Sequence, residues 1–302
     1  MKQKRNRPYP DFVIAGAPKC GTTALYQYLI THPGVYLSKV KEPCYFATDL
    51  PGLRQIRDER HYGALFADAD DSVQTGEALV WYLYSKDAVR NIRSVNPDTK
   101  FIVMLRNPVD MAHALHMEQL RIRNETVDDF AKAWALQNER KLGRSLPRLC
   151  RQPELLRYQE ICALGSQVAR LRESADPRRV HIVVFDDFVK KTQESYQAVL
   201  NFLELPDDNR TIFPRVNPST RIRSQAVADF FASPPAPLRY LRSALRSVGV
   251  RPGNVIHRLN QRITAREPVP AEVRTAISRS YTDEIMLLER LLQRPLIAWH
   301  AS

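Results

Sequence analysis

The sequence predicts a three-layer α/β fold in which a central parallel sheet is flanked by helices, with a helical extension at the C-terminus. Short apolar, β-branched runs at 12–14, 101–105 and 181–185 have the length and composition of buried strands. Each run is followed by a segment with helical spacing of apolar residues. Strands that alternate with helices in this way form parallel sheets with helices on both faces.

The other elements follow in chain order. We expect a strand at 35–37, a short helix near 62–66, a helix at about 86–95 after the apolar run 78–84, and helices at 108–120, 126–141, 154–174 and 196–203. Pro108 suits the first turn of its helix, and Gly165 is expected to interrupt the helix at 154–174. We divide the chain into a core of residues 1–232 and a basic extension of residues 233–302, with helical pieces at about 238–247 and 270–293.

Composition narrows the functional classes. The net charge of +12 over 302 residues indicates an anionic ligand, and it also suits an acidic acceptor or membrane surface. No nucleic-acid-binding motif is present, so no nucleic-acid partner is expected.

The four cysteines lack paired or metal-ligand spacing, which predicts a reduced chain without a metal site. The basic N-terminus lacks the apolar segment of a secretory signal and no apolar run is long enough to span a membrane, so we expect a cytoplasmic protein. The oligomeric state cannot be predicted.

The loop from Gly16 to Thr23 joins the first strand to the first helix and has the composition of an anion cradle. Glycines let the backbone approach a ligand closely, and the free N–H groups of a helix's first turn point toward an anion. The two glycines have the spacing of a P-loop, but the residue after Gly21 is Thr22 and the lysine is displaced to Lys19. That displacement argues against ordinary ATP or GTP hydrolysis, although Lys19 still supplies a cation.

Three segments resemble landmarks of one enzyme family, in the right order. They are APKCGTTAL (17–25), KEPCYF (41–46) and FIVMLRNPVD (101–110). They are similar to segments of sulfotransferases that use 3′-phosphoadenosine-5′-phosphosulfate (PAPS), especially the branch that contains the heparan-sulfate sulfotransferases and their bacterial relatives. The resemblance covers about residues 10–120 well and weakens to about 225. It implies a P-loop-like fold and in-line transfer of a sulfuryl group to an acceptor hydroxyl, with PAP as product and no metal.

The resemblance also implies which residues bind the donor. Lys19 would hold the 5′-phosphosulfate and stabilise the leaving oxygen, together with Cys20, Gly21, Thr22 and Thr23. Arg106, at the end of a buried strand, would bind the 3′-phosphate, as a guanidinium can do with two parallel hydrogen bonds. Arg221 and Arg223 match, by order alone, a basic segment that closes over the nucleotide in relatives. Relatives place a serine eight residues after the arginine, where this chain has Ala114, so another donor must replace that hydroxyl or the 3′-phosphate is bound less tightly.

On the acceptor side, Glu42 matches the family's general base, beside Lys41. Relatives continue with a GE-(K/T)-(S/T)-P-x-Y pattern, whereas this chain has Ala78 after Glu77 and lacks the lysine that some relatives place beside the sulfate. We assign Lys41, Glu77 and Trp81 to the acceptor side, and for Trp81 a place in the buried core is equally consistent with the sequence.

His113 and His116 share a helix face after Arg106. Histidine is the base in the cytosolic branch of sulfotransferases, so His116 is the alternative base, although packing alone also explains both histidines.

Two other functions stay open. The apolar run 183–185 followed by Asp186 has the shape of the metal-binding strand of a P-loop kinase, and a Mg²⁺ requirement would separate that function from sulfuryl transfer. A non-catalytic protein that binds acidic glycan or lipid is the second, and the losses at Ala78 and Ala114 favour it. The arginines at 239, 242 and 246 share one helix face opposite an apolar stripe, which suits an anionic acceptor or an acidic membrane surface.

Overall fold

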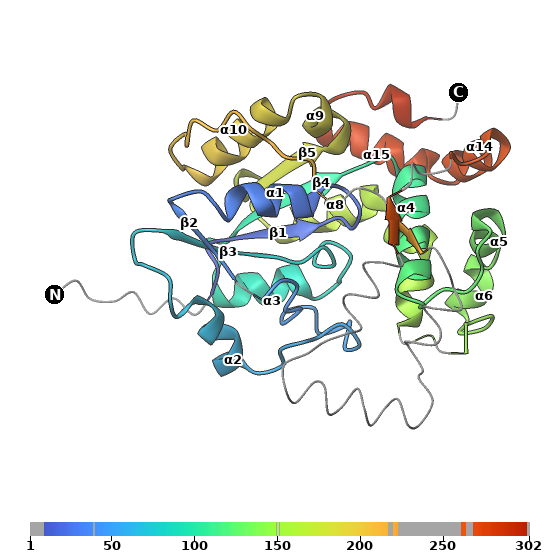
Figure 1. Cartoon of the computed structure of the whole chain (residues 1–302), viewed down its shortest axis with the longest axis horizontal. Coiled ribbons are helices and arrows are strands. Elements are labelled where there is room, and N and C mark those ends of the chain that lie inside the picture. The colour runs from blue at the N-terminus through green and yellow to red at the C-terminus, as the bar shows by residue number, and fades with distance from the viewer. Residues whose placement is uncertain are drawn as a thin grey trace. The chain divides into compact units, whose positions relative to one another are not determined.

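The computed structural model contains a central sheet of five parallel strands in the order β2-β3-β1-β4-β5 (Figure 1). The structure describes residues 9–38, 40–148, 150, 152–216, 220–222, 261–263 and 268–300. The strands are β1 (Phe12–Gly16), β2 (Val35–Leu37), β3 (Gln74–Ala78), β4 (Lys100–Leu105) and β5 (Val180–Val184). The predicted α/β fold is therefore confirmed.

Strand β1 lies in the middle of the sheet and is fully buried, as its apolar sequence requires. Val13 is paired with Glu77 of β3 on one side and with Phe101 of β4 on the other. The chain leaves β1 toward β2 and later passes β1 again to form β4 on its other side. Ligands of open α/β sheets bind beyond the carboxyl ends of the strands at such a reversal. The loop after β1 lies at that point.

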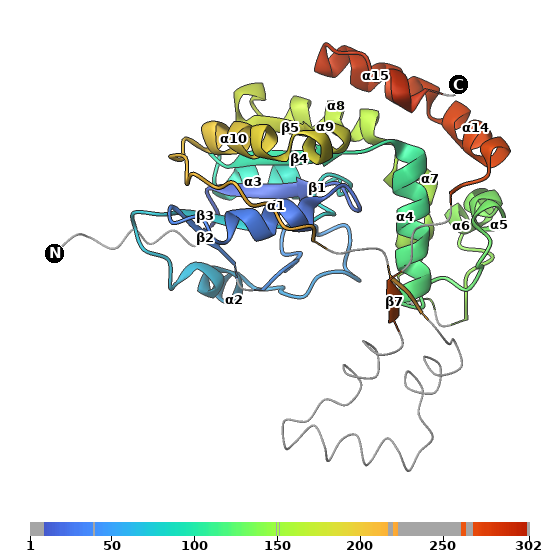
Figure 2. The ribbon, with the colours of Figure 1, turned by 45° about the horizontal axis from the view of Figure 1, so that its top comes forward.

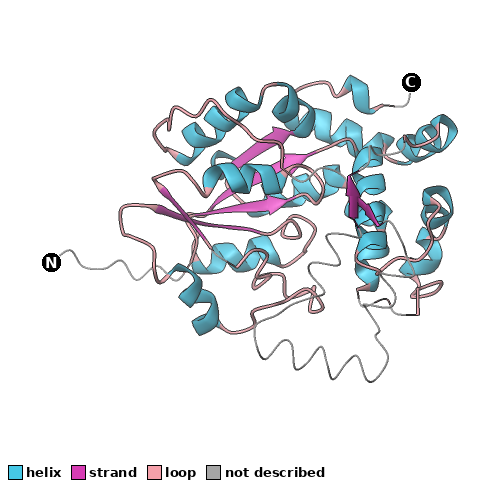
Figure 3. Cartoon of the chain, viewed as in Figure 1, coloured by secondary structure: helices cyan, strands magenta, loops and turns pink. Residues whose placement is uncertain are grey.

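Helices cover both faces of the sheet (Figure 3). The ring of Tyr28 in α1 contacts the rings of Phe188 in α9 and Tyr196 in α10, which places these helices on one face. Right-handed connections place α3 and α8 on the other face, where they contact each other. The helices of this part are α1 (Thr22–Leu29), α2 (Glu59–Gly63), α3 (Ala88–Val95), α4 (Pro108–Arg121), α5 (Phe130–Ala135), α6 (Gln137–Lys141), α7 (Tyr158–Ile161), α8 (Leu164–Ser174), α9 (Phe185–Lys190) and α10 (Thr192–Leu203).

Several elements differ from the sequence-based expectation. The third strand of the chain is Gln74–Ala78, and the apolar run after it folds as turns. The helix expected at 126–141 is divided into α5 and α6 at Leu136. The helix expected at 154–174 is divided before Leu164, whereas Gly165 lies inside α8, where the backbone of Glu284 would stand 2.4 Å from an added Cβ.

The described C-terminal helices pack on the same unit as the sheet (Figure 2). They are α14 (Ala271–Ser280) and α15 (Thr282–Leu292). Glu284 of α15 accepts a hydrogen bond from the Ser166 backbone N–H of α8 at 2.7 Å, and the Trp299 indole donates to Asp186 at 2.8 Å. None of the described helices combines the length and apolar character that crossing a membrane requires.

Residues 217–268 form a second unit, of which the structure describes little more than the antiparallel pair β6 (Thr220–Ile222) and β7 (Gln261–Ile263). The helix predicted at about 238–247, with the arginines at 239, 242 and 246, lies outside the described residues. The division of the chain at residue 233 stays a prediction.

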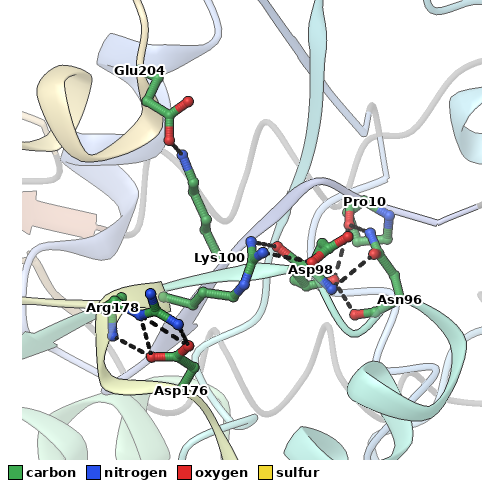
Figure 4. Close-up of polar contacts among 9 residues, drawn as sticks. Pro10, Asn96, Asp98, Lys100, Asp176, Arg178 and Glu204 are labelled. Atoms are coloured by element: carbon green, nitrogen blue, oxygen red, sulfur yellow. Dashed lines mark hydrogen bonds and ion pairs between the residues drawn. The ribbon is translucent and has the colours of Figure 1, made fainter.

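Polar contacts join the segments at the amino ends of the strands, opposite the glycine loop (Figure 4). Before β4, the Asn96 side-chain amide donates to the Pro10 carbonyl at 3.1 Å. The Lys100 ammonium at the start of β4 lies 2.7 Å from Glu204, and Arg178, just before β5, lies 2.8 Å from Asp176. These cations are paired at the amino ends of the strands, away from the loop.

Candidate functional site

The loop between β1 and α1 is held by its neighbours in an open, left-handed path. The Ala17 N–H donates to the Met104 carbonyl of β4 at 2.8 Å, which ties the loop to the neighbouring strand. Lys19 and Gly21 have φ angles of 62° and 91°. Gly21 caps α1 without a side-chain hydrogen bond, so no capping side chain competes with an anion for the N–H groups of Thr22 and Thr23, whereas the Ala24 N–H donates to the Gly21 carbonyl at 2.9 Å. The predicted order of strand, glycine-bounded loop and helix start is therefore present, and its role as an anion cradle stays a prediction.

Lys19 and Arg106 meet at this loop. The Arg106 guanidinium donates to the Lys19 carbonyl at 3.2 Å and lies 4.6 Å from the centroid of the Phe185 ring. The Lys19 ammonium points to α4, where it lies 3.5 Å from a carboxylate oxygen of Glu118. Two half-buried cations thus lie at this loop, one held at the Lys19 carbonyl and the other turned toward α4.

Lys41 and Glu42 reach the same place from the segment after β2. The Lys41 ammonium donates to the Thr23 hydroxyl at 2.9 Å, and the Glu42 N–H donates to the Ala78 carbonyl at 3.3 Å. Burial raises the pKa of Glu42; the charge of Glu118 raises it further, and those of Lys41 and Lys19 lower it. The site therefore combines cations with a carboxylate that takes up a proton more readily than a free glutamate.

The Cys20 and Glu77 side chains are part of the core beneath these loops. Cys20 is fully buried against Met111, and burial raises the pKa of its thiol to about 12, so only its backbone is available to a ligand. Glu77 is also fully buried and accepts a hydrogen bond from the Tyr62 hydroxyl. Burial raises the pKa of Glu77 to about 7, although Tyr62 and Tyr82 act in the opposite direction. Any part of Glu77 in acceptor binding is therefore indirect.

A comparison with known protein families identifies the family of the chain that carries these residues. A family model described as "Sulfotransferase domain" matches residues 9–216. The chain belongs to the sulfotransferase family. The predicted family is thereby confirmed, and the alternative of a P-loop kinase is not supported. In this sulfotransferase Asp186, on which that alternative rested, accepts the hydrogen bond of the Trp299 indole.

Several proteins that are similar to this chain are named as sulfotransferases. Mouse carbohydrate sulfotransferase 15 is 28% identical over 171 residues, covering 43% of this chain and 30% of that protein. Human heparan sulfate glucosamine 3-O-sulfotransferase 6 is 35% identical over 106 residues, covering 35% of this chain and 29% of that protein. A sulfotransferase structure from Alicyclobacillus acidocaldarius is 25% identical, with a TM-score of 0.70 and coverage of 96% of this chain and 98% of that one. The match thus spans about 30% of the length of these two curated relatives, and 98% of the length of the bacterial structure.

Of the remaining predicted residues, His116 and Trp81 are buried, and Arg221 and Arg223 belong to the second unit. His116 is fully buried on α4, where its Nε2 lies 2.7 Å from the Val127 carbonyl, and burial lowers its pKa. This geometry favours a packing role over that of a base. Trp81 is 7% exposed and packs edge-on against Tyr84, so its place is mainly in the core. Arg221 lies in β6, of which only the backbone is described, and Arg223 lies outside the described residues.

Sequence reasoning missed the pair of Glu118 and Arg121 at the end of α4. The Arg121 guanidinium donates to both carboxylate oxygens of Glu118, with an Nε–Oε2 distance of 3.0 Å. Their spacing of three residues, and the spacing of four between Ala114 and Glu118, put all three on one helix face. The spacing of four from Ala114, where relatives place a serine, is the sequence signal that could have pointed to Glu118. Among the described residues no cluster of three metal-ligating side chains was found.

Proposed function

We propose that this sulfotransferase transfers a sulfuryl group from PAPS to an acceptor hydroxyl, with Glu42 as the base. The observation that carries the proposal is the convergence of Lys19, Lys41 and Glu42 at the start of α1. They come from two loops at the carboxyl edge of the sheet, and Thr23 and Glu118 link them. One carboxylate with a raised pKa among several cations is the set of groups that transfer between oxygens requires.

The donor set fits an anionic phosphosulfate. Lys19 and the first-turn N–H groups of α1 would hold the 5′-phosphosulfate, and Lys41, through its contact with Thr23, would add a second cation beside the same helix end. Arg106, which already contacts the loop at the Lys19 carbonyl, would bind the 3′-phosphate. As the sulfur–oxygen bond to the 5′-phosphate breaks, negative charge grows on the leaving oxygen, where the Lys19 ammonium stabilises it.

Glu42 would take the proton of the acceptor hydroxyl while the new sulfur–oxygen bond forms. Its backbone is fixed by the bond to Ala78 and by a hydrogen bond from Gln55 to its carbonyl at 3.0 Å. Its φ of 60° lies in the left-handed region, which is uncommon for a residue other than glycine. The acceptor class stays open among glycans, lipids and small natural products, because variable loops build acceptor pockets.

Calorimetry of PAP and PAPS without Mg²⁺ tests the donor half of the proposal. We expect the native chain to bind both, and Lys19→Ala to bind about 10- to 100-fold more weakly, the effect of losing hydrogen bonds to a charged group. Lys191→Ala is the matched control, because Lys191 pairs with Glu194 on the exposed side of α10. Binding of ATP with Mg²⁺ in place of PAP contradicts the proposal. Binding of acidic polymer alone favours the non-catalytic alternative.

The acceptor half is tested with Glu42→Gln. Because the amide keeps the size of the side chain but cannot take a proton, the variant should bind PAP like the native chain and transfer no sulfuryl group to any acceptor of a screened panel. A variant with native activity would mean that another group is the base.

A further inference from the structure

Glu118 is a second carboxylate at the site, and the proposed mechanism gives it no role. It lies on α4 one turn after Ala114, with its side chain 28% exposed. A carboxylate oxygen of Glu118 lies 3.5 Å from the Lys19 ammonium. The Arg121 guanidinium, on the next turn of the helix, donates hydrogen bonds to the same carboxylate. The carboxylate is thus shared between the loop lysine and a helix arginine.

This carboxylate is ionised at neutral pH. Burial alone would raise the pKa of Glu118, but the hydrogen bond from Arg121 and the charges of Lys19 and Arg121 outweigh burial and lower it. A sulfuryl donor presents its own negative charge to the same ammonium. Two anions drawn to one cation repel each other over a few ångströms, so both cannot hold Lys19 equally well.

We propose that Glu118 is an internal competitor of the donor, a carboxylate that occupies the Lys19 ammonium until the donor displaces it. The inference rests on the proposed function, because it requires that the donor binds Lys19. Arg121 makes the exchange feasible, since its two hydrogen bonds keep Glu118 paired after Lys19 has moved to the donor. Glu118 is therefore a positioning residue that acts on donor affinity through Lys19.

A second consequence concerns Glu42, whose charged neighbours are Lys41, Lys19 and Glu118, with the Cys44 thiol beside it. Glu118 is the negatively charged one of these neighbours, so it makes ionisation of Glu42 harder. Removing its charge should lower the pKa of Glu42. This effect can be followed without donor or acceptor, by carbon-13 NMR of the glutamate carboxyl groups.

The test is a cycle of Glu118→Gln, Lys19→Ala and the double variant, with PAP binding measured by calorimetry. Glutamine keeps the size of the side chain and an oxygen for Arg121. We expect Glu118→Gln to tighten PAP binding about three- to ten-fold, and the gain to vanish in the Lys19→Ala background. Glu194→Gln, which removes an exposed carboxylate from its pair with Lys191, is the matched charge control and should leave PAP binding unchanged.

Each outcome decides the inference. Unchanged or weaker PAP binding by Glu118→Gln, in a chain whose PAP binding depends on Lys19, overturns it and leaves the proposed function intact. A gain that persists in the Lys19→Ala background also overturns it, because Glu118 would then act by general charge. An unchanged NMR titration of Glu42 removes the second consequence. If the native chain does not bind PAP at all, the proposed function fails and the inference falls with it.

Discussion

Replacement of Arg106 by alanine separates two roles that the structure allows for this side chain. Its guanidinium supports the loop through the Lys19 carbonyl at 3.2 Å, and it is proposed to bind the 3′-phosphate of the donor. Loss of the first contact should weaken every nucleotide that uses the loop. Loss of the second should weaken only nucleotides with a 3′-phosphate. PAP and AMP differ by that phosphate, so comparing them isolates the second role.

The magnitude follows from the bond that is lost. A hydrogen bond to a charged group contributes about 1.5–3 kcal/mol, which corresponds to about a 12- to 160-fold change in affinity. The native chain should therefore prefer PAP to AMP by at least about ten-fold, and Arg106→Ala should reduce that preference to about one-fold. The contact with the Phe185 ring, 4.6 Å from its centroid, should affect both ligands alike and cancel from the ratio.

Calorimetry of both nucleotides on both chains gives the four affinities. Arg178→Ala is the matched control, because Arg178 is paired with Asp176 at the opposite edge of the sheet (Figure 4). Equal weakening of PAP and AMP by Arg106→Ala would refute the assignment. It would mean that Arg106 acts through the loop and that the 3′-phosphate is bound elsewhere.

Three further predictions concern the base and the core. Because burial raises the pKa of Glu42, the acid limb of kcat/KM should lie above the usual range of a glutamate, with activity rising as pH passes that pKa; a pH–rate profile that is flat there would contradict this. Gly76→Ala should destabilise the fold by about 1–3 kcal/mol in thermal denaturation, since its Cβ would lie 2.4 Å from the Phe12 ring, and an unchanged Tm would be against it. Arg140→Ala should cost about 3–5 kcal/mol by leaving the fully buried Glu125 without its ion pair, and restored stability in the double variant with Glu125→Gln would support that cause.

Most of the sheet could be predicted because most of its strands are short apolar runs in the sequence. Residues 101–105 and 35–37 are apolar in a pattern that the structure reproduces within a residue. Strand β3 could not be placed, because Gln74–Ala78 carries polar residues and a glycine in a position where strands are usually apolar. Its strand character comes from its neighbours. Gly76 lies against the Phe12 ring, and Glu77 is buried by its pairing with β1 and by the Tyr62 hydroxyl.

The site was predicted to the extent that its residues follow strands or lie in recognisable segments. Lys19, Glu42 and Arg106 could be proposed from the sequence because each belongs to a motif, and their roles stay predictions. Glu118 was not proposed, because this partly buried position of α4 belongs to no motif, and its role depends on Lys19, which lies 99 positions earlier in the chain. Glu77 and His116 were assigned to the site, yet both are fully buried, a property that spacing alone does not reveal.

The backbone around the site adds an argument that is independent of any resemblance. Lys19, Glu42 and Cys44 have φ angles of 62°, 60° and 54°, a left-handed region that costs a non-glycine residue about 1–2 kcal/mol. Such conformations persist only where surrounding contacts enforce them, and they gather at functional sites. Here those contacts are the hydrogen bonds from Arg106 to the Lys19 carbonyl and from the Glu42 N–H to Ala78. Glycine would adopt these angles without that cost, so the lysine and the glutamate stand where conformation alone favours glycine. The proposed transfer reaction explains why these residues are kept there, because it needs a cation and a carboxylate at this end of α1.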